Sequence, residues 1–406
     1  MRQPTKARVR LDEQKAASFG PAGRASCRFW LSTSRPRSNF VAARLAETED
    51  RESAAQNAYI PNSGDNVSVI ATATNAVIAT IPVGSSPAGA AVTPDGTRVY
   101  VTNAGSGTVS VIDAATNAVT ATVPVVGRPF GVAVSPDGSK VYVAVAITND
   151  STVSVIATAT NAVTGTIPIV GNPVDVAVSP DGSKVYVTSP SSNTVSVIDA
   201  ATNAVIATIP VSMQPFVVAV TPDGSKVYVT NFTAPGTVSV IDTATNTVTG
   251  TIPVGNAPEG ILVTPDGSKV YVANAADGTV SVINTATNTV TDAIPVGIAP
   301  VSVAITPDGS KVYVVNSFNP VGTVSVIAVT TNMVIATIPV GSQPIAFGHF
   351  IQPAPRFAGT PGKANCFGQS VAALASQFGG LNAAAAALGF TSVGVLQNAI
   401  LAFCGG

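Results

Sequence analysis

Residues 100–141 read YVTNAGSGTVSVIDAATNAVTATVPVVGRPFGVAVSPDGSKV, and this stretch is one copy of a unit that repeats along most of the chain. Its central word, Val-Ser-Val-Ile, occurs seven times, at residues 67–70, 109–112, 153–156, 195–198, 238–241, 280–283 and 324–327. Successive copies start 42 to 44 residues apart. A fixed period of this length indicates an array of similar structural units.

Within each unit the apolar residues alternate with a period of two, which is typical of β-strands. Short runs such as Val-Tyr-Val, Val-Ser-Val-Ile and Gly-Val-Ala-Val are rich in β-branched and aromatic residues, and turn residues bound each run. The pattern predicts four strands per unit. In the Pro-Asp-Gly turns, proline presets φ and glycine releases the chain afterwards. In the second kind of turn, Asp-x-x-Thr-Asn, we expect Asp113 to bond the backbone two residues on and Asn117 to adopt a left-handed φ.

Seven units of four antiparallel strands predict an all-β fold, a closed seven-bladed β-propeller. The ends of the array support closure. The repeats begin at Tyr59, so the first unit lacks an inner strand. They end with Pro344–Gln352, which aligns with the inner stretch Pro129–Asp137 and has no outer strands after it. Pairing these ends would remove two open sheet edges, so we expect one propeller over residues 58–352, with the stretch 344–352 closing the blade that begins at residue 59.

Three copies of the unit carry a recognisable word, Tyr-Val-Thr-Asn at 100–103 and 228–231 and Tyr-Val-Ala-Asn at 271–274. With its flanks, this word resembles the YVTN-type β-propeller repeat, and the resemblance covers about residues 59–352. It implies a propeller of the kind found in bacterial exported proteins and archaeal surface proteins, most of which are treated as binding or surface proteins. Related seven-bladed propellers include lactonases and redox enzymes, so the resemblance leaves an enzyme class open.

Residues 1–57 differ in composition from the repeats. They carry 11 of the 20 Lys and Arg residues against six acidic residues, and also the single Trp, Trp30. No run of about 7–15 apolar residues follows the first arginines, so no signal peptide is recognisable. A disordered basic arm, a transit-like segment and a misassigned start all stay open. The stretch Ser-Ala-Ala-Gln-Asn-Ala-Tyr at 53–59 is rich in small residues, which is typical of a signal cleavage site and would fit export.

The chain changes character again after the repeats. Residues 353–361 are a Pro/Gly-rich linker, and residues 362–406 have a helical pattern, with helices expected at 369–378, 383–388 and 393–403. Cys366 and Cys404 bracket this small module, and we expect a disulfide between them, contributing roughly 4 kcal/mol. The alternative is two reduced thiols. The module also resembles one found at the C-terminus of exported alphaproteobacterial proteins, which implies export.

A functional site is expected where the near-identical units differ. Because the strands alternate in direction, the Pro-Asp-Gly and Asp-x-x-Thr-Asn turns lie on one face, and the crossovers between blades lie on the other. Variable loops are where binding residues are usually placed. The crossovers depart from their consensus at Arg128, Phe130, Asp175, Met213, Phe216, Glu259 and Gln343. At one mouth of the channel these residues would suit a small polar ligand or a peptide end. The alternative is drift in exposed loops.

His349 is the only histidine, and it aligns with Val134 on the inner strand of the closing blade. We expect it to pack between blades. A catalytic role would need a carboxylate or metal partner that the sequence does not identify. No motif for a metal, a phosphate loop or a nucleophile elbow is present, so no metal or cofactor is expected. A lactonase-like or lyase-like enzyme at the channel mouth is the first alternative function.

Nucleic-acid binding is the second alternative, since a bacterial protein of the repeat family is reported to bind single-stranded DNA. Residues 59–352 carry seven basic and fifteen acidic residues. Five of the bases are the lysines of Pro-Asp-Gly-Ser-Lys. Each follows an aspartate by three residues, which cancels much of its field toward phosphate. The charge pattern therefore argues against this role for the repeats.

Only 10% of the residues are charged, and no stretch of 18 apolar residues exists, so no transmembrane segment is expected. Taken together, the residues predict a non-catalytic propeller scaffold that binds a protein, glycan or small ligand. We expect it to be monomeric and exported, in the cell envelope or outside the cell.

Overall fold

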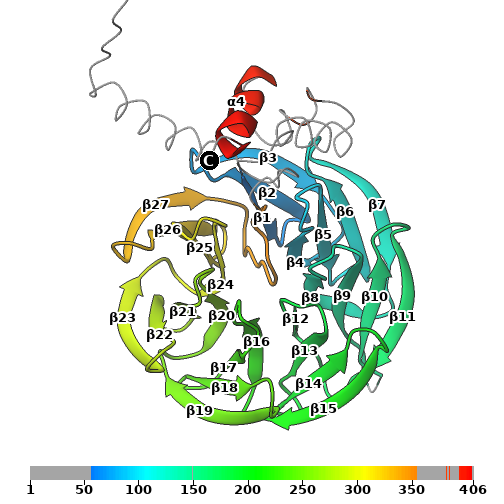
Figure 1. Cartoon of the computed structure of the whole chain (residues 1–406), viewed down its shortest axis with the longest axis vertical. Helices are drawn as coiled ribbons and strands as arrows, with labels where there is room; N and C mark the ends of the chain where they lie inside the picture. The colour runs from blue at the N-terminus through cyan, green and yellow to red at the C-terminus, as the bar shows by residue number, and fades with distance from the viewer. Residues whose placement is uncertain (1–55, 149, 354–380, 382–383, 385–392, 405–406) are drawn as a thin grey trace, which may run out of the picture. The chain divides into compact units, whose positions relative to one another are not determined.

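The computed structural model describes residues 56–148, 150–353, 381, 384 and 393–404. The described strands form seven antiparallel sheets around a central axis, which confirms the predicted seven-bladed propeller (Figure 1). Blade 1 contains β1 (Asn57–Asn62), β2 (Asn66–Ala71) and β3 (Ala76–Pro82). Blade 2 contains β4 (Pro87–Val92), β5 (Arg98–Asn103), β6 (Thr108–Asp113) and β7 (Ala118–Pro124). Blade 3 contains β8 (Arg128–Val134), β9 (Lys140–Ala146), β10 (Thr152–Ala157) and β11 (Ala162–Pro168).

The remaining four blades repeat the same order from the inner strand to the outer strand. Blade 4 contains β12 (Asp175–Val178), β13 (Lys184–Ser189), β14 (Thr194–Asp199) and β15 (Ala204–Pro210). Blade 5 contains β16 (Pro215–Val220), β17 (Lys226–Asn231), β18 (Thr237–Asp242) and β19 (Thr247–Pro253). Blade 6 contains β20 (Pro258–Val263), β21 (Lys269–Asn274), β22 (Thr279–Asn284) and β23 (Thr289–Pro295). Blade 7 contains β24 (Pro300–Ile305), β25 (Lys311–Asn316), β26 (Thr323–Ala328) and β27 (Met333–Pro339).

The closing segment, Pro344–Gln352, completes blade 1 as the alignment of the repeats predicts. Isolated bridges join it to β1 near both of its ends. The Tyr59 amide donates to the Phe350 carbonyl at 2.9 Å, and the Ile345 amide donates to the Pro61 carbonyl at 3.0 Å. Since β1 is the first strand of the array, this pairing closes the ring.

The middle of the closing segment departs from the regular strand that the repeats predict. The Ala90 amide donates to the Phe347 carbonyl at 2.9 Å, and the Phe347 amide donates to the Ala88 carbonyl at 3.1 Å. Ala88 and Ala90 belong to β4, so the segment bonds to blades 1 and 2 together. Gly348, with φ of 108°, supplies a backbone conformation that side-chain-bearing residues rarely adopt. Figure 1 shows the chain after β27 turning inward to the centre of the ring.

The core lies between the blades and is built from the second and third strands of each. The tyrosine of each Val-Tyr-Val run, or of its blade 1 equivalent, is fully buried: Tyr59, Tyr100, Tyr142, Tyr186, Tyr228, Tyr271 and Tyr313. The hydrophobic clusters join neighbouring blades, as where Val153 and Val155 of blade 3 pack with Val185 and Val187 of blade 4. Fully burying a side chain of this kind contributes about 1.5–3 kcal/mol, so the interfaces between blades dominate stability.

The turns confirm the predicted division into two faces. On the turn face, Asp113 accepts the Ala115 amide at 3.1 Å and Asn117 has φ of 54°, both as expected. The opposite face, called the crossover face, contains the crossovers between blades and the loops between second and third strands. These two kinds of loop contact each other, as where the Ala104 amide, after β5, donates to the Ser86 carbonyl of the crossover before β4. The crossover face carries large exposed apolar side chains: Val126, Val170, Met213, Ile298, Phe318 and Val321.

Outside the propeller, the structure describes one helix, α4 (Val393–Cys404), where the sequence predicts a helix over 393–403. The predicted helix 369–378, the predicted helix 383–388 except for Ala384, Cys366 and with it the proposed disulfide lie outside the described residues, as do residues 1–55 of the predicted arm. Within the part of the chain that is described, no helix has the length and apolar character needed to cross a membrane.

Candidate functional site

The inner strands of the blades surround a central channel that holds a cavity of about 300 Å³. Its wall comes from β8, β12, β16, β20, β24 and the closing segment. Most of this wall is aliphatic, with Val134, Val178, Val220, Val263 and Ile305 at one equivalent position of successive inner strands. Pro136 and Pro180, from the Pro-Asp-Gly turns, also line it, so the cavity extends toward the turn face.

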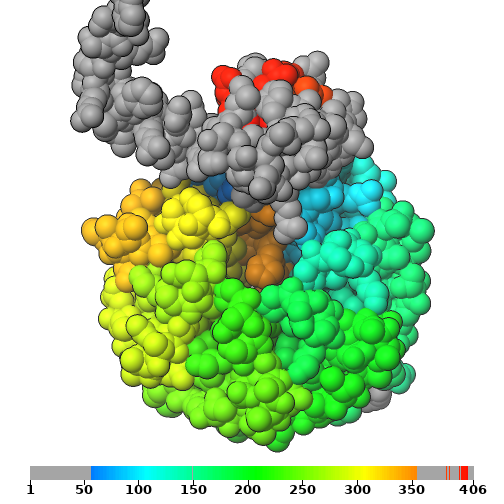
Figure 2. Space-filling view, viewed as in Figure 1, coloured from blue at the N-terminus to red at the C-terminus, as the bar shows by residue number. Residues whose placement is uncertain are grey.

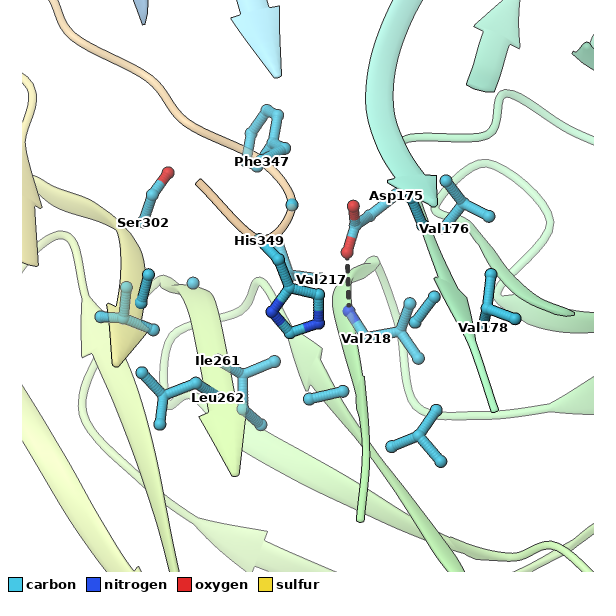
Figure 3. Close-up of a pocket in the computed structure, with 18 of the residues that line it drawn as sticks. Asp175, Val176, Val178, Val217, Val218, Ile261, Leu262, Ser302, Phe347 and His349 are labelled. Atoms are coloured by element: carbon cyan, nitrogen blue, oxygen red, sulfur yellow. Dashed lines mark hydrogen bonds between the residues drawn. The ribbon is translucent and has the colours of Figure 1, made fainter. Parts of the chain in front are cut away.

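Asp175 is the carboxylate of this cavity, and it sits deeper than the sequence suggests. The prediction placed it at the channel mouth, whereas it stands inside the channel wall with 2% of its surface exposed (Figure 3). The reason is its position two residues after the crossover proline, where three other blades have Gly89, Gly131 and Gly260. A Cβ at Gly131 would lie only 2.5 Å from Asp175 Oδ1, so glycine there leaves the space that the carboxyl occupies.

The two oxygens of Asp175 differ in their surroundings. Oδ2 accepts the Val218 amide of the next blade at 3.1 Å. Oδ1 is buried and accepts no hydrogen bond from the described residues. Burial raises the pKa of Asp175 to about 7, against the smaller opposing effect of the Val218 and Val176 amides. Oδ1 lies against Gly131 of the neighbouring blade, and a buried carboxyl with one unsatisfied oxygen is costly to the fold.

His349 lines the same cavity, so the expectation that it packs between blades is wrong (Figure 3). Its repeat equivalent, Val134, also faces the cavity, and this shows why the histidine does. The imidazole is accessible from the channel, but the channel wall surrounds it and separates it from bulk water. This desolvation lowers the pKa of His349 below the ordinary 6.5. The ring is therefore neutral near pH 7 and offers one donor and one acceptor.

An aromatic cluster packs beside these two residues. The Phe216 and Phe347 rings meet edge to face at 5.8 Å between centroids, and Phe216 also contacts Phe232 at 5.4 Å. Phe347 is 6% exposed and packs with Val217 and Ile261. Phe216 lies on the inner strand directly after its crossover proline, so the cluster stands toward the crossover end of the channel. Phe216, a predicted ligand-binding residue, is thus part of the packing that shapes this end.

The other predicted site residues do not line the cavity. Arg128 is exposed, and its guanidinium lies 5.5 Å from the centre of the Phe130 ring. Glu259 is half-buried, and burial raises its pKa to about 7. Gln343 is exposed on the crossover face with φ of 43°. The structure therefore joins only Asp175, from the predicted set, with His349.

Lysines of the turn face hydrogen-bond to neighbouring blades, which bears on the prediction that the repeats do not bind nucleic acid. Lys140, Lys184, Lys269 and Lys311 each donate from Nζ to a backbone carbonyl of the following blade, at 2.7 to 3.4 Å. Arg98 makes the equivalent bond to Thr158 at 2.6 Å. These cations therefore join the blades, as well as facing solvent.

Phe347 and Ser302 belong to the cavity and were not predicted. Ser302 holds the same repeat position as Asp175, and its Oγ accepts the Ala346 amide at 3.1 Å. Comparing the repeats with one another could have identified Asp175 and His349 together. Both Asp175 and His349 replace an otherwise small or aliphatic residue on an inner strand, and inner strands line the axis.

Comparisons with known proteins support the fold. A family model described as a YNCE-like beta-propeller matches residues 35–149, well under half of the chain. The chain resembles hydrazine synthase of Kuenenia stuttgartiensis at 26% identity and a TM-score of 0.61, over 66% of this chain and 91% of that one. It also resembles a functionally unknown protein from Desulfotomaculum acetoxidans DSM 771, at 20% identity and a TM-score of 0.63, over 73% and 98% of the two chains.

A third similar structure is the dihydro-heme d1 dehydrogenase NirN in complex with DHE, at 17% identity and a TM-score of 0.56, over 72% of this chain and 75% of that one. No curated protein matches the chain. These similarities establish a β-propeller, and propellers with enzyme names are among them. They assign no activity to this chain.

Proposed function

We propose that this chain is a non-catalytic propeller that binds a small ligand in its central channel. The observation that carries the proposal is the convergence of Asp175 and His349, from different blades, in one largely aliphatic cavity of about 300 Å³. A concave apolar site with a few convergent polar groups is typical of small-molecule binding, and typical ligand pockets hold about 300–1,000 Å³. The volume supports a small ligand.

The repeats themselves support a role for Asp175 beyond the fold. Gly89, Gly131 and Gly260 fill its position in other blades, and Ser302 fills it in blade 7. Ser302 already makes the bond to the neighbouring inner strand. A buried carboxyl is not needed to join two blades, and leaving one oxygen unsatisfied costs about 1–3 kcal/mol. The cost of this group to the fold supports a role for Asp175 other than stability.

A thermal-shift screen of small molecules against the full chain tests this function. Ligands that raise the melting temperature of the wild type, and that lose this effect on the double variant Asp175→Ser and His349→Val, support it. Both substitutions insert the residue of another blade at the same repeat position, so the variant is expected to fold. A screen without any hit that depends on these two residues would contradict the proposal.

An enzyme at the channel is a second candidate. The observation in its favour is that a carboxyl group with a pKa raised to about 7 shares a cavity with a neutral imidazole, and perturbed groups of this kind often serve as general acids or bases. A panel of lactones and other hydrolysable substrates, assayed with the wild type and with Asp175→Asn, separates the two. Turnover that Asp175→Asn abolishes would replace the binding function with a catalytic one.

We also propose that the chain is exported and that a protein or glycan partner would dock on the crossover face. The YNCE-like match and the C-terminal resemblance support export, and mass spectrometry of the native N-terminus in each cell fraction tests it. Large exposed apolar side chains support that face. A partner identified in the native setting should lose affinity on Val126→Ser with Val170→Ser, and keep it on Ile78→Ser at the outer strand.

A further inference from the structure

The channel wall offers a ligand one exposed polar side chain, and the ligand class inferred from it rests on the proposed small-ligand function. Three polar side chains line the cavity, those of Asp175, Ser302 and His349. Asp175 and Ser302 are each 2% exposed, so they lie within the wall. His349 is exposed to the channel. A molecule in the cavity therefore meets an imidazole among apolar side chains.

The His349 ring makes no hydrogen bond to the described residues. Its backbone carbonyl accepts the Val92 amide at 3.0 Å, which holds the residue in place and leaves both ring nitrogens available. Figure 3 shows the imidazole directed into the space that Val218, Ile261 and Leu262 line. Figure 2 shows the closing segment, which carries His349, at the hollow centre of the ring. Because the ring is neutral near pH 7, it presents one acceptor and one donor to the channel.

The wall disfavours a charged ligand. No lysine or arginine lines the cavity, so a carboxylate or phosphate would meet no cation there. An ammonium ion would meet no exposed carboxylate, because Asp175 is buried in the wall. An unpaired charge in apolar surroundings is costly. A metal ion would have too few ligands, since no group of three His, Cys, Asp or Glu residues gathers in the described part of the chain. The ligand that fits is uncharged and largely apolar.

We propose that the channel binds a small phenol, whose hydroxyl donates to the unprotonated ring nitrogen of His349 and whose aryl body packs against the aliphatic wall. A phenolic hydroxyl is uncharged at neutral pH, because its pKa is about 10, and it is a more acidic donor than an aliphatic alcohol. An apolar cavity of about 150 Å³ accommodates benzene. The cavity of about 300 Å³ therefore has room for one ring with short substituents.

Isothermal titration of the full chain at pH 7.5 with p-cresol, p-xylene and 4-methylbenzoate tests the assignment. The three probes share one ring and a para methyl group, and they differ in the group that would reach His349. We expect p-cresol to bind at least about threefold more tightly than p-xylene, since only p-cresol forms a hydrogen bond to the imidazole. 4-Methylbenzoate should bind most weakly, because its charge stays unpaired.

Matched variants assign the preference to His349. His349→Val inserts the residue that blade 3 has at the same repeat position, and it should reduce p-cresol affinity at least about fivefold while keeping or raising p-xylene affinity. His349→Gln restores a side chain that donates and accepts, so it should retain the preference for p-cresol. Ile78→Thr, at an exposed outer-strand position where blade 2 has Thr120, should change neither affinity. Urea midpoints confirm that each variant folds.

A second measurement needs no variant. His349 is the only histidine, so labelling the histidine of the full chain with ¹⁵N gives the NMR signals of a single imidazole. Saturating p-cresol should move the signal of the unprotonated nitrogen toward that of a protonated one, because this nitrogen accepts a hydrogen bond. Saturating p-xylene should move it less.

The outcomes separate the two claims. Equal affinity for p-cresol and p-xylene, p-cresol binding that survives His349→Val, or an unmoved nitrogen signal would overturn the phenol assignment and leave small-ligand binding in place. Tighter binding of 4-methylbenzoate would do the same. If none of the three probes binds, the phenol assignment fails, and a small-molecule screen that also finds nothing would remove the proposed function with it.

Discussion

The Tyr313 hydroxyl donates to Asn75 Oδ1 at 2.6 Å, across the point where the last blade meets the first. The two residues are 238 positions apart in the chain. Equivalent bonds join Tyr100 to Asn161 and Tyr271 to Asn332, at 2.8 and 3.0 Å, between blades that are not at the closure. The interface that closes the ring is therefore built from the same parts as the interfaces inside the array, although these two residues come from opposite ends of the array.

Removing the Tyr313 hydroxyl should destabilise the propeller. Tyr313→Phe loses this partly buried hydrogen bond and is expected to lower the free energy of unfolding by about 1 kcal/mol. Tyr142→Phe is the matched control, because the Tyr142 hydroxyl is buried without a partner among the described residues, and it should cost nothing or stabilise. Urea unfolding of both variants checks the pair, and equal losses would show that the bond to Asn75 contributes nothing.

The closing segment should depend on Phe350. This side chain is fully buried in a hydrophobic cluster that also contains Ile60 of blade 1 and Val324 of blade 7. Phe350→Ala is expected to cost about 3–5 kcal/mol, because it removes a large buried side chain and leaves a cavity. Phe318→Ala, at a position 47% exposed on the crossover face, should stay within about 0.5 kcal/mol of the wild type. If both variants unfold at the same urea concentration, the segment does not hold the ring closed.

The sequence predicts the scaffold well because every copy of the unit carries the same local instructions. The strand boundaries follow the Val-rich runs, the glycines of the Pro-Asp-Gly turns adopt φ of 71–73°, and Pro344–Gln352 pairs with β1. Because the unit occurs seven times, each strand or turn preference is seen in several copies and can be predicted from their agreement. Departures within one copy, such as the irregular middle of the closing segment, have no second copy to reveal them.

The site could be predicted only in part. Substituted positions point to Asp175, but its depth depends on the missing side chain of Gly131 in the neighbouring blade, which is a contact across the fold. His349 aligns with Val134, which also lines the cavity. The meeting of Asp175 and His349 depends on closure through the whole ring, so no local pattern in the sequence could show it.

Burial of Asp175 should make stability depend on pH. Its pKa is about 7 in the folded chain and 3.8 ordinarily, so the folded state holds the proton more tightly. The stabilisation is fully present below about pH 3.8 and is lost as the pH rises through about 7. Asp175→Asn should therefore gain on the wild type by a few kcal/mol between pH 4 and 8, since each pKa unit corresponds to about 1.4 kcal/mol. Urea unfolding across this range checks it, and parallel curves for the two proteins would contradict the burial of a titrating carboxyl.

The aspartates of the turns should produce the opposite slope at lower pH. In Asp181 the Ser179 hydroxyl, the Ser183 amide and the Ser183 hydroxyl all donate to the carboxylate, and they lower its pKa to about 2. Asp137, Asp223 and Asp266 have the same arrangement and the same shift. A depressed pKa gives stability that is present above the ordinary value of 3.8 and is lost as the pH falls through about 2.

Asp181→Asn should thus cost about 1 kcal/mol at pH 7, because one charged acceptor is lost, and the cost should shrink as the pH falls from 4 to 2. Unfolding of the wild type, Asp181→Asn and Asp175→Asn over pH 2–8 separates the two effects. The wild type is expected to be most stable near pH 4, where the turn aspartates are ionised and Asp175 still keeps its proton. A cost for Asp181→Asn that stays constant down to pH 2 would show that the turn holds an uncharged oxygen as well as a carboxylate.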